Sequence, residues 1–281
     1  VLGCTEGKDL LGLKAKHPYL SRDSVIFSGE HVTTETGTGV VHTAPGHGLE
    51  DYSVAMENGL DILSPVQGNG TFSDEVEHLA GMFVFKSNDK VIEILEENDA
   101  LLAKADYQHS YPHCWRHKTP LMFRATPQWF IGMESKDLLK NAFSSIENIH
   151  WEPDWGKARM ASMLDSRPDW CISRQRSWGV PITLLVHNET GEIHPDIETI
   201  IEKVATLIEK DGIQAWHDVE VSDLIDDSEK YFKVTDCLDV WFDSGVTHAC
   251  VLNSNDELDF PADLYLEGSD QHRGWFQSSL L

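Results

Sequence analysis

The chain has 281 residues, of which 41% are hydrophobic and 25% are charged, and its formal net charge is −25 at pH 7. These values are typical of a globular protein with room for about two structural units, and they exclude a disordered chain. Because no apolar run approaches the ~18 residues of a membrane span and no signal peptide is visible, we expect a cytoplasmic protein without a membrane partner.

From residue 1 to about residue 102, short β-prone runs alternate with turns. The strongest strand candidates are residues 25–35, 39–44 and 81–86. A helix is predicted over residues 87–104, with Ser87 or Asn88 as its cap and a buried stripe that includes Ile94.

The following region is rich in prolines and aromatic residues, which favours short connecting elements. From residue 195 the pattern predicts a helix that Gly212 stops, because six aliphatic residues between Ile197 and Ile208 fall on one face. Residues 237–245 and 263–281 each predict a strand that runs into a turn, and the second continues into an apolar helix. An autonomous domain seldom ends inside such a unit, so we expect an internal piece of a larger polypeptide.

The stretch "GTGVVHTAPGHGLEDY", residues 37–52, contains four glycines, a proline, two histidines and two adjacent carboxylates. Glycines let a ligand approach the backbone closely, so a binding loop is one interpretation. The spacing of His42, His47 and Asp51 leaves a metal site open as a second. A third is a turn in which Glu50 or Asp51 caps a helix over residues 51–59.

Positive charge is concentrated in one part of this acidic chain. Residues 114–178 hold ten Lys or Arg against seven Asp or Glu, whereas the other residues hold twelve against forty. Phosphate binding needs local positive potential, so this window is the candidate nucleic-acid surface. Chance clustering on a solvated face explains the same charges equally well.

Four stretches read together resemble one family in the same order: "GTGVVHTAPGHGLEDY", "WCISRQRSWGVPI", "DVWFDSG" and "YLEGSDQHRGWFQSS". With "YPHCWRHKTPLMFRATPQWF" between the first two, the chain resembles the middle of bacterial isoleucyl-tRNA synthetases along essentially its whole length. The resemblance implies ATP-dependent attachment of isoleucine to tRNA(Ile), with Mg as a cofactor and hydrolytic editing of mischarged Val-tRNA. It also implies a monomeric parent protein. A metal-dependent hydrolase and a non-catalytic tRNA-binding module are the alternatives.

The implied fold class is α/β, with a β-rich editing remnant and part of a Rossmann-like nucleotide-binding fold. Residues 1–106 resemble the C-terminal part of the editing domain, and residues 107–194 a connecting region. Residues 195–281 resemble a connecting helix and the start of the second catalytic half. The ATP signature motifs of the HIGH and KMSKS types, and the threonine-rich strand of the editing pocket, have no match here.

The resemblance assigns the residues of an editing pocket, which are His42, Asp51, Thr38 and Gly39. Asp51 would hold the α-ammonium of the misattached amino acid, since a buried cationic amine needs a paired anion. His42 would help admit valyl and exclude isoleucyl groups. In the family that the chain resembles, editing is needed because the single methylene that distinguishes the two amino acids is worth only about 1–3 kcal/mol; that family is the standard example of this limit.

The C-terminal end resembles the isoleucyl-adenylate site, with Glu267, Asp270 and Gln271 as polar contacts. Trp241 and Trp275 would wall the isoleucine side chain, although ordinary core packing is the simpler interpretation of a lone Trp.

Two further assignments concern the basic window. Arg174 and Arg176 are candidate tRNA contacts, with ion pairs to Asp165 or Asp169 as the alternative. Cys114 and His117 have the spacing of half a zinc site, so zinc in the parent protein stays open. The five cysteines are odd in number and scattered, which is typical of reduced thiols.

Overall fold

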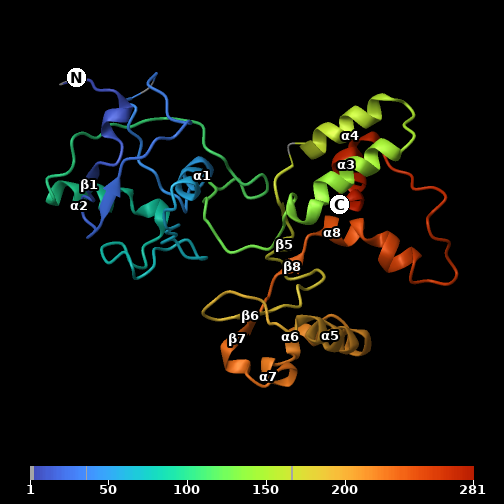
Figure 1. Cartoon of the computed structure of the whole chain (residues 1–281). Coiled ribbons are helices and arrows are strands. Elements are labelled where there is room, and N and C mark those ends of the chain that lie inside the picture. The colour runs from blue at the N-terminus through green and yellow to red at the C-terminus, as the bar shows by residue number, and fades with distance from the viewer. Residues whose placement is uncertain (1–2, 36, 166) are drawn as a thin grey trace. The chain divides into compact units, whose positions relative to one another are not determined.

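The computed structural model describes residues 3–35, 37–165 and 167–281. The chain divides into two compact units, Val1–Pro127 and Gln128–Leu281. Figure 1 shows the first unit in blue to green and the second in green to red.

The first unit has few regular elements, and they are short. In chain order they are the 3-10 helix η1 (Gly7–Leu10), strands β1 (Lys14–Lys16) and β2 (Asp23–Val25), helix α1 (Leu49–Glu57), the 3-10 helix η2 (Val84–Lys86) and helix α2 (Asn88–Glu97). Its small core contains Val76 and Leu79 packed against Ile94 of α2.

The second unit is predominantly helical. Its helices are η3 (Ser135–Asp137), α3 (Leu138–Asn148), α4 (Trp155–Asp165), α5 (Ile197–Asp211), α6 (Gln214–Asp218), α7 (Val221–Leu224), η4 (Ser228–Lys230), α8 (Val240–Gly245), the π-helical turn η5 (His248–Leu252), η6 (Ser269–Arg273) and α9 (Trp275–Leu280). Its strands are β3 (Phe130–Ile131), β4 (Trp170–Cys171), β5 (Ser173–Arg174), β6 (Leu185–His187), β7 (Tyr231–Lys233) and β8 (Cys237–Leu238).

The described residues form four small sheets, each of two antiparallel strands: β1 with β2, β3 with β4, β5 with β8, and β6 with β7. In the β5–β8 pair Ser173 lies opposite Leu238, and Arg174 lies opposite Cys237. This register brings two segments more than sixty residues apart in sequence side by side. It fixes the position of the residues that follow β8.

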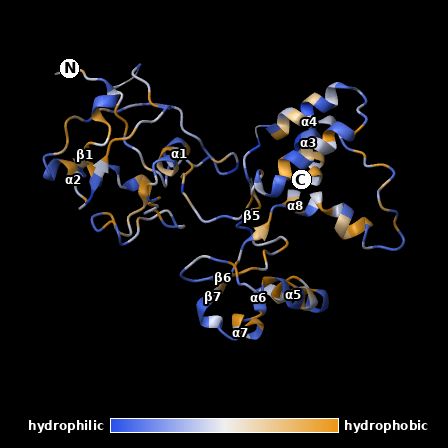
Figure 2. Ribbon diagram, in the orientation of Figure 1, coloured by the Kyte–Doolittle hydropathy of each residue, from blue (hydrophilic) through white to orange (hydrophobic). Residues whose placement is uncertain are grey.

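Two larger cores hold the second unit. Ile200 and Val204 of α5 are buried against Leu185, Trp216 and Leu224. A separate cluster joins α3, α4 and α9, with buried Ala142, Ile146, Met160 and Leu164 packed against Phe276 and Leu280. In Figure 2 the ribbon of α5 carries both hydrophobic and hydrophilic residues, as one buried face and one solvated face require.

The predicted helices are confirmed. The 195–212 pattern forms α5, and Gly212, with φ of +80°, ends it by donating its N–H to the carbonyl of Ile208. The 87–104 pattern forms the shorter α2. Ser87 is its N-cap residue, but the Ser87 side chain accepts no hydrogen bond from the backbone of the first turn. Its hydroxyl instead donates to the carbonyl of Val84 at 2.7 Å.

Most of the predicted strands are wrong. Of residues 25–35 only Val25 lies in a strand, residues 39–44 form none, and residues 81–86 contain a single bridge and η2. The segment before Glu267 is also irregular, so the strand predicted there is absent. A β-prone run needs a partner strand for its backbone hydrogen bonds. Val40 and Val41 have no partner strand in the described part of the chain, and they are 57% and 56% exposed.

Within the described part of the chain, no helix combines the length and the apolar character that a bilayer crossing needs.

Candidate functional site

The glycine-rich loop of residues 37–48 leads into α1 in the first unit. Its tightest point is Gly46, where a Cβ would lie 2.2 Å from the carbonyl oxygen of Leu63. The carbonyl of Gly46 accepts a hydrogen bond from the N–H of Ala125 at 2.7 Å. A residue without a side chain is therefore required where the loop meets these two distant segments.

Asp51 lies in the first turn of α1 and reaches back over the loop. Its Oδ2 accepts the N–H of Ala44 at 2.9 Å, and its Oδ1 lies 4.0 Å from Nε2 of His31. The side chain is 22% exposed. A carboxylate in the first turn is stabilised by the helix dipole. Asp51 thus binds the loop backbone at Ala44 with one oxygen and presents the other oxygen toward His31.

The predicted histidines do not join Asp51. His42 is exposed. Burial lowers the pKa of His17, and Arg22 and then His42 contribute further to this shift. Nδ1 of His47 donates to the carbonyl of Phe123 at 2.9 Å. The structure therefore does not support a metal site formed by His42, His47 and Asp51. In the residues that the structure describes, no group of three or more His, Cys, Asp or Glu is placed to hold a metal.

Thr38 and Gly39 begin the same loop. Thr38 Oγ1 accepts the N–H of Val40 at 3.3 Å, and Gly39 has φ of +74°. Among the described residues the hydrogen bonds of Asp51 run to Ala44 and not to Thr38, Gly39 or His42. Glu50 and Asp51 do not supply a side-chain cap to α1, since the flanking residue is Gly48.

Cys114 and His117 form the predicted pair. The Sγ of Cys114 lies 3.6 Å from Nδ1 of His117 and accepts the backbone N–H of His117 at 3.4 Å. Tetrahedral zinc with ordinary Zn–S and Zn–N bonds places such ligands about 3.6 Å apart. The pair thus fits two positions of a zinc site, and the described residues supply no third.

Three of the five residues predicted for the adenylate site meet in the second unit, where α8, η6 and α9 converge. Gln271 Oε1 accepts the N–H of Trp275 at 3.2 Å, and the indole Nε1 of Trp275 donates to the carbonyl of Ser244 in α8 at 3.0 Å. A Cβ at Gly274 would lie 2.1 Å from Gln271 Oε1 and 3.0 Å from Cη2 of Trp241. Gly274 therefore allows Trp241, Gln271 and Trp275 to approach one another.

Of the other two predicted residues, only Asp270 contacts a member of this cluster in the part of the chain that the structure describes. Asp270 is exposed and accepts a hydrogen bond from Gln271 Nε2 at 3.1 Å. Glu267 is exposed. Tyr265, which the sequence analysis did not single out, stacks on Trp275 with ring centroids 3.4 Å apart and planes 9° from parallel. The sequence does contain a signal for Tyr265, because it is the first residue of the stretch "YLEGSDQHRGW", which also contains Gln271 and Trp275.

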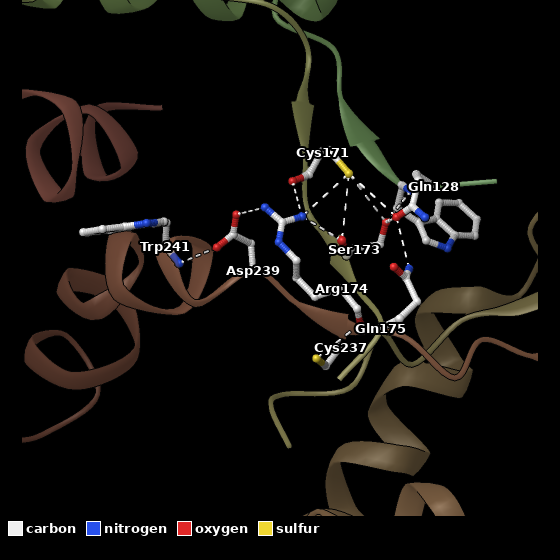
Figure 3. Close-up of polar contacts among 9 residues, drawn as sticks. Gln128, Cys171, Ser173, Arg174, Gln175, Cys237, Asp239 and Trp241 are labelled. Atoms are coloured by element: carbon white, nitrogen blue, oxygen red, sulfur yellow. Dashed lines mark hydrogen bonds and ion pairs between the residues drawn. The ribbon is translucent and has the colours of Figure 1, made fainter. Parts of the chain in front are cut away.

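A polar network joins β5 to the start of α8 (Figure 3). Arg174 makes an ion pair through Nη2 with Oδ2 of Asp239. Its Nη1 donates to the carbonyl oxygens of Cys171 at 2.9 Å and of Ser173 at 2.7 Å. Asp239 Oδ1 accepts the backbone N–H of Trp241 at 3.0 Å. Asp239 is therefore the link between Arg174 and Trp241.

Ser173 extends this network toward β3. Its hydroxyl accepts the N–H of Trp129 at 2.8 Å and donates to Oε1 of Gln128 at 2.7 Å, and Gln175 Nε2 donates to the same oxygen at 3.1 Å. Ser173 is 2% exposed. Both backbone and side chains thus hold the strand that carries Arg174.

The alternative pairings expected for Arg174 are wrong. Its partner is Asp239 rather than Asp165 or Asp169, and Asp169 instead accepts the N–H of Met133 at 2.9 Å. Sequence spacing could not reveal this pair, because its members are 65 residues apart. Arg176 differs from Arg174, since it is exposed and the structure records no ion pair for it among the described residues.

The charge of Asp239 also acts on two other titratable groups. Arg167 stacks over the Trp170 ring at 5.1 Å; burial lowers its pKa, and the charge of Asp239 opposes that shift. Burial, and secondly the charge of Asp239, raise the pKa of Asp243 in α8. Asp239 is therefore paired with Arg174, and its charge also affects the pKa values of Arg167 and Asp243.

Asp239 itself was missed by the sequence analysis. Its position directly before a helix is typical of a capping residue, but the pattern of residues 237–245 predicts a strand and a turn; the strand is present as β8, and α8 stands in place of the turn. The structure makes Asp239 the cap of α8.

Comparison with known sequences shows the family of this chain. The family described as tRNA synthetases class I (I, L, M and V) matches residues 21–281. Curated relatives named isoleucine–tRNA ligase from Idiomarina loihiensis, Marinomonas sp. and Vibrio cholerae are 56%, 56% and 55% identical to it over 281, 281 and 283 residues, which is 100% of this chain. The chain spans about 30% of the length of these relatives. This chain, with its mixture of helices and small sheets, belongs to the class I tRNA synthetases.

Proposed function

We propose that the protein to which this chain belongs is an isoleucine–tRNA ligase that edits mischarged Val-tRNA. The observation that supports this most strongly is the 55–56% identity to relatives of that name along the whole chain. Its partners are tRNA(Ile), isoleucine and ATP with Mg, and it works in the cytoplasm as a monomer. The finer fold follows from this proposal: an editing remnant in the first unit and part of a Rossmann-like fold in the second.

The activation site is proposed at the convergence of α8, η6 and α9. The aromatic faces of Trp241 and Trp275 suit an aliphatic side chain. Glu267, Asp270 and Gln271 carry the polar atoms for the amino group and the adenylate. ATP supplies the adenylyl group that activates the carboxylate of isoleucine. The residues that hold its phosphates, of the HIGH and KMSKS types, lie outside this chain.

The editing pocket is proposed at the loop before α1. Asp51 supports it, because one carboxylate oxygen is held by the N–H of Ala44, and the other, 4.0 Å from Nε2 of His31, can accept a hydrogen bond from an α-ammonium. The reaction then requires only a positioned water that attacks the ester carbonyl. His42, Thr38 and Gly39 complete the wall in this proposal, together with segments of the parent protein.

The tRNA acceptor end is proposed to contact the basic window through Arg176. Its exposure and the absence of a recorded ion pair in the described residues support this role. Arg174 makes a weaker candidate because its guanidinium is occupied by Asp239 and two carbonyls.

The test uses the full-length parent protein and two assays. Isoleucine-dependent exchange of pyrophosphate into ATP measures activation, and deacylation of Val-tRNA(Ile) measures editing. Glu267→Ala is expected to reduce exchange without affecting deacylation, and Asp51→Ala is expected to do the reverse. A parent protein with neither activity would overturn the proposal. Deacylation abolished by a chelator would favour the metal-dependent hydrolase, and salt-sensitive tRNA binding alone would favour the binding module.

A further inference from the structure

Asp239 divides its two carboxylate oxygens between two partners. Oδ2 pairs with Arg174, and Oδ1 accepts the N–H of Trp241, the second residue of α8. The backbone N–H of Asp239 donates to the carbonyl of Ile172 at 2.7 Å, so its main chain is also fixed. The Asp239 side chain is 8% exposed. A carboxylate so enclosed depends on its partners for its orientation.

Arg174 is suited to hold this carboxylate because its own guanidinium is held in turn. Nη1 is anchored on the carbonyls of Cys171 and Ser173, which leaves Nη2 directed at Asp239. Figure 3 shows this arrangement, with Arg174 and Trp241 on opposite sides of the Asp239 carboxylate. A planar fork with several donors can hold three acceptors at once, whereas a lysine ammonium on a flexible stem cannot reproduce the geometry.

The position of Trp241 connects this network to the cluster of aromatic residues. Its Cη2 lies close to Gly274, next to Gln271 and Trp275. Trp241 is 41% exposed, so its ring is not fixed by burial alone. The hydrogen bond from its N–H to Asp239 therefore contributes to the placement of the ring.

We propose that Arg174 is a positioning residue for amino-acid selection. Through Asp239 it fixes the first turn of α8 and so holds the Trp241 ring at the wall of the isoleucine pocket. The inference rests on the proposed function for the identity of the amino acid. It assigns Arg174 to the amino-acid site rather than to the tRNA.

The neighbouring charges do not replace this role. The charge of Asp239 also acts on Arg167, but the guanidinium of Arg167 stacks on the Trp170 ring. Asp243 carries a like charge next to Asp239, which makes the cation of Arg174 more important to the cluster. Loss of Arg174 leaves Asp239 with Arg167 as its remaining cation and free to rotate away from the N–H of Trp241.

The experiment measures pyrophosphate exchange by the full-length parent protein and its Arg174→Ala variant. The KM for isoleucine is expected to rise about tenfold, which corresponds to about 1.4 kcal/mol of binding free energy. The KM for ATP is expected to stay within about twofold. The preference for isoleucine over valine in exchange is expected to fall, because a displaced Trp241 shapes the pocket less well. A merely structural role would not change the two KM values differently.

Two conservative variants strengthen the test and serve if Arg174→Ala does not fold. Arg174→Lys keeps the charge without the fork, so its KM for isoleucine is expected between those of the parent protein and Arg174→Ala. Asp239→Asn retains an acceptor for the N–H of Trp241, so it is expected to raise the KM for isoleucine less than Asp239→Ala does. Equal effects of Asp239→Asn and Asp239→Ala would contradict the capping step.

Arg159→Ala is the matched control. Arg159 is exposed on α4, and its removal takes one arginine from the basic window without touching Asp239. It is expected to leave both KM values unchanged. The proposal is wrong if Arg174→Ala leaves the KM for isoleucine unchanged while it weakens tRNA binding and reduces the salt dependence of that binding by about one counterion.

Hydrogen exchange separates this inference from the proposed function. The amide of Trp241 is expected to exchange faster in Arg174→Ala than in the parent protein, whichever amino acid the enzyme activates. An unchanged Trp241 amide would overturn the positioning role. A parent protein without isoleucine-dependent exchange would overturn the proposed function instead.

Discussion

The carboxylate of Asp239 accepts the backbone N–H of Trp241 at 3.0 Å, and this bond defines the beginning of α8. A short helix depends strongly on its cap, since its first N–H groups have no partners within the helix. The geometry of the aromatic cluster in the second unit therefore depends on one buried carboxylate. That dependence can be tested, as can several other contacts of the structure.

Substitution of Gly46 by alanine is expected to disturb the loop before α1. A Cβ at this position would meet the backbone of Leu63 at 2.2 Å, so the loop must shift, at a cost of about 1–3 kcal/mol. In the full-length parent protein we expect Val-tRNA deacylation to fall with little change in isoleucine activation. Gly68→Ala is the matched control, because a Cβ there has open space around it. Equal deacylation by the two variants would contradict the prediction.

Two substitutions of Asp51 separate its structural role from its proposed binding role. Asp51→Asn keeps an oxygen for the N–H of Ala44 but loses the charge that would bind an α-ammonium. We expect deacylation to fall by tenfold or more in both Asp51→Asn and Asp51→Ala, since an unpaired buried amine is costly, about 1–3 kcal/mol or more. Only Asp51→Ala is expected to increase hydrogen exchange at Ala44. Normal deacylation by Asp51→Asn would exclude the binding role.

Gly274→Ala is expected to damage the activation site. A Cβ would lie 2.1 Å from Gln271 Oε1 and 3.0 Å from the Trp241 ring, so both side chains must move. We expect the KM for isoleucine in pyrophosphate exchange to rise about tenfold or more. Deacylation of Val-tRNA provides the internal control, and a loss of both activities would indicate general misfolding.

Asp243→Asn is expected to stabilise the second unit at neutral pH. Burial and the charge of Asp239 raise the pKa of Asp243, so the folded state binds this proton more tightly than the unfolded state does. Protonation of Asp243 therefore contributes fully to the free energy of unfolding below the unfolded pKa of about 3.9. This contribution is lost as the pH rises through the folded pKa. The stabilisation by Asn should be largest at pH 7 and should vanish below about pH 4. Protection of the α8 amides, compared between the two proteins at each pH, measures it; a gain that grows toward low pH would refute it.

The sequence predicted helices better than strands, for a physical reason that particular residues illustrate. The aliphatic residues of α5 repeat with the helical period, and a helix satisfies its own backbone. The run around Val40 and Val41 has β-prone residues but no partner strand, and both valines remain exposed.

The candidate sites show the same limit. The motif that contains Gln271 and Trp275 is local, so its residues could be named from the sequence. The pair of Arg174 and Asp239 joins two strands through their register, which no spacing along the chain encodes.

The loop before α1 is closed from far along the chain. Nδ1 of His47 donates to Phe123, 76 residues away, and Gly46 accepts from Ala125. The intervening segment forms a ring whose closure depends on its two ends, and the entropic cost of such a ring grows only slowly with its length. Surface turns between residues 47 and 123 can therefore gain or lose residues during evolution while the glycine-rich loop keeps its shape. In contrast, one residue inserted or deleted between Phe123 and Ala125 would break the two contacts with His47 and Gly46.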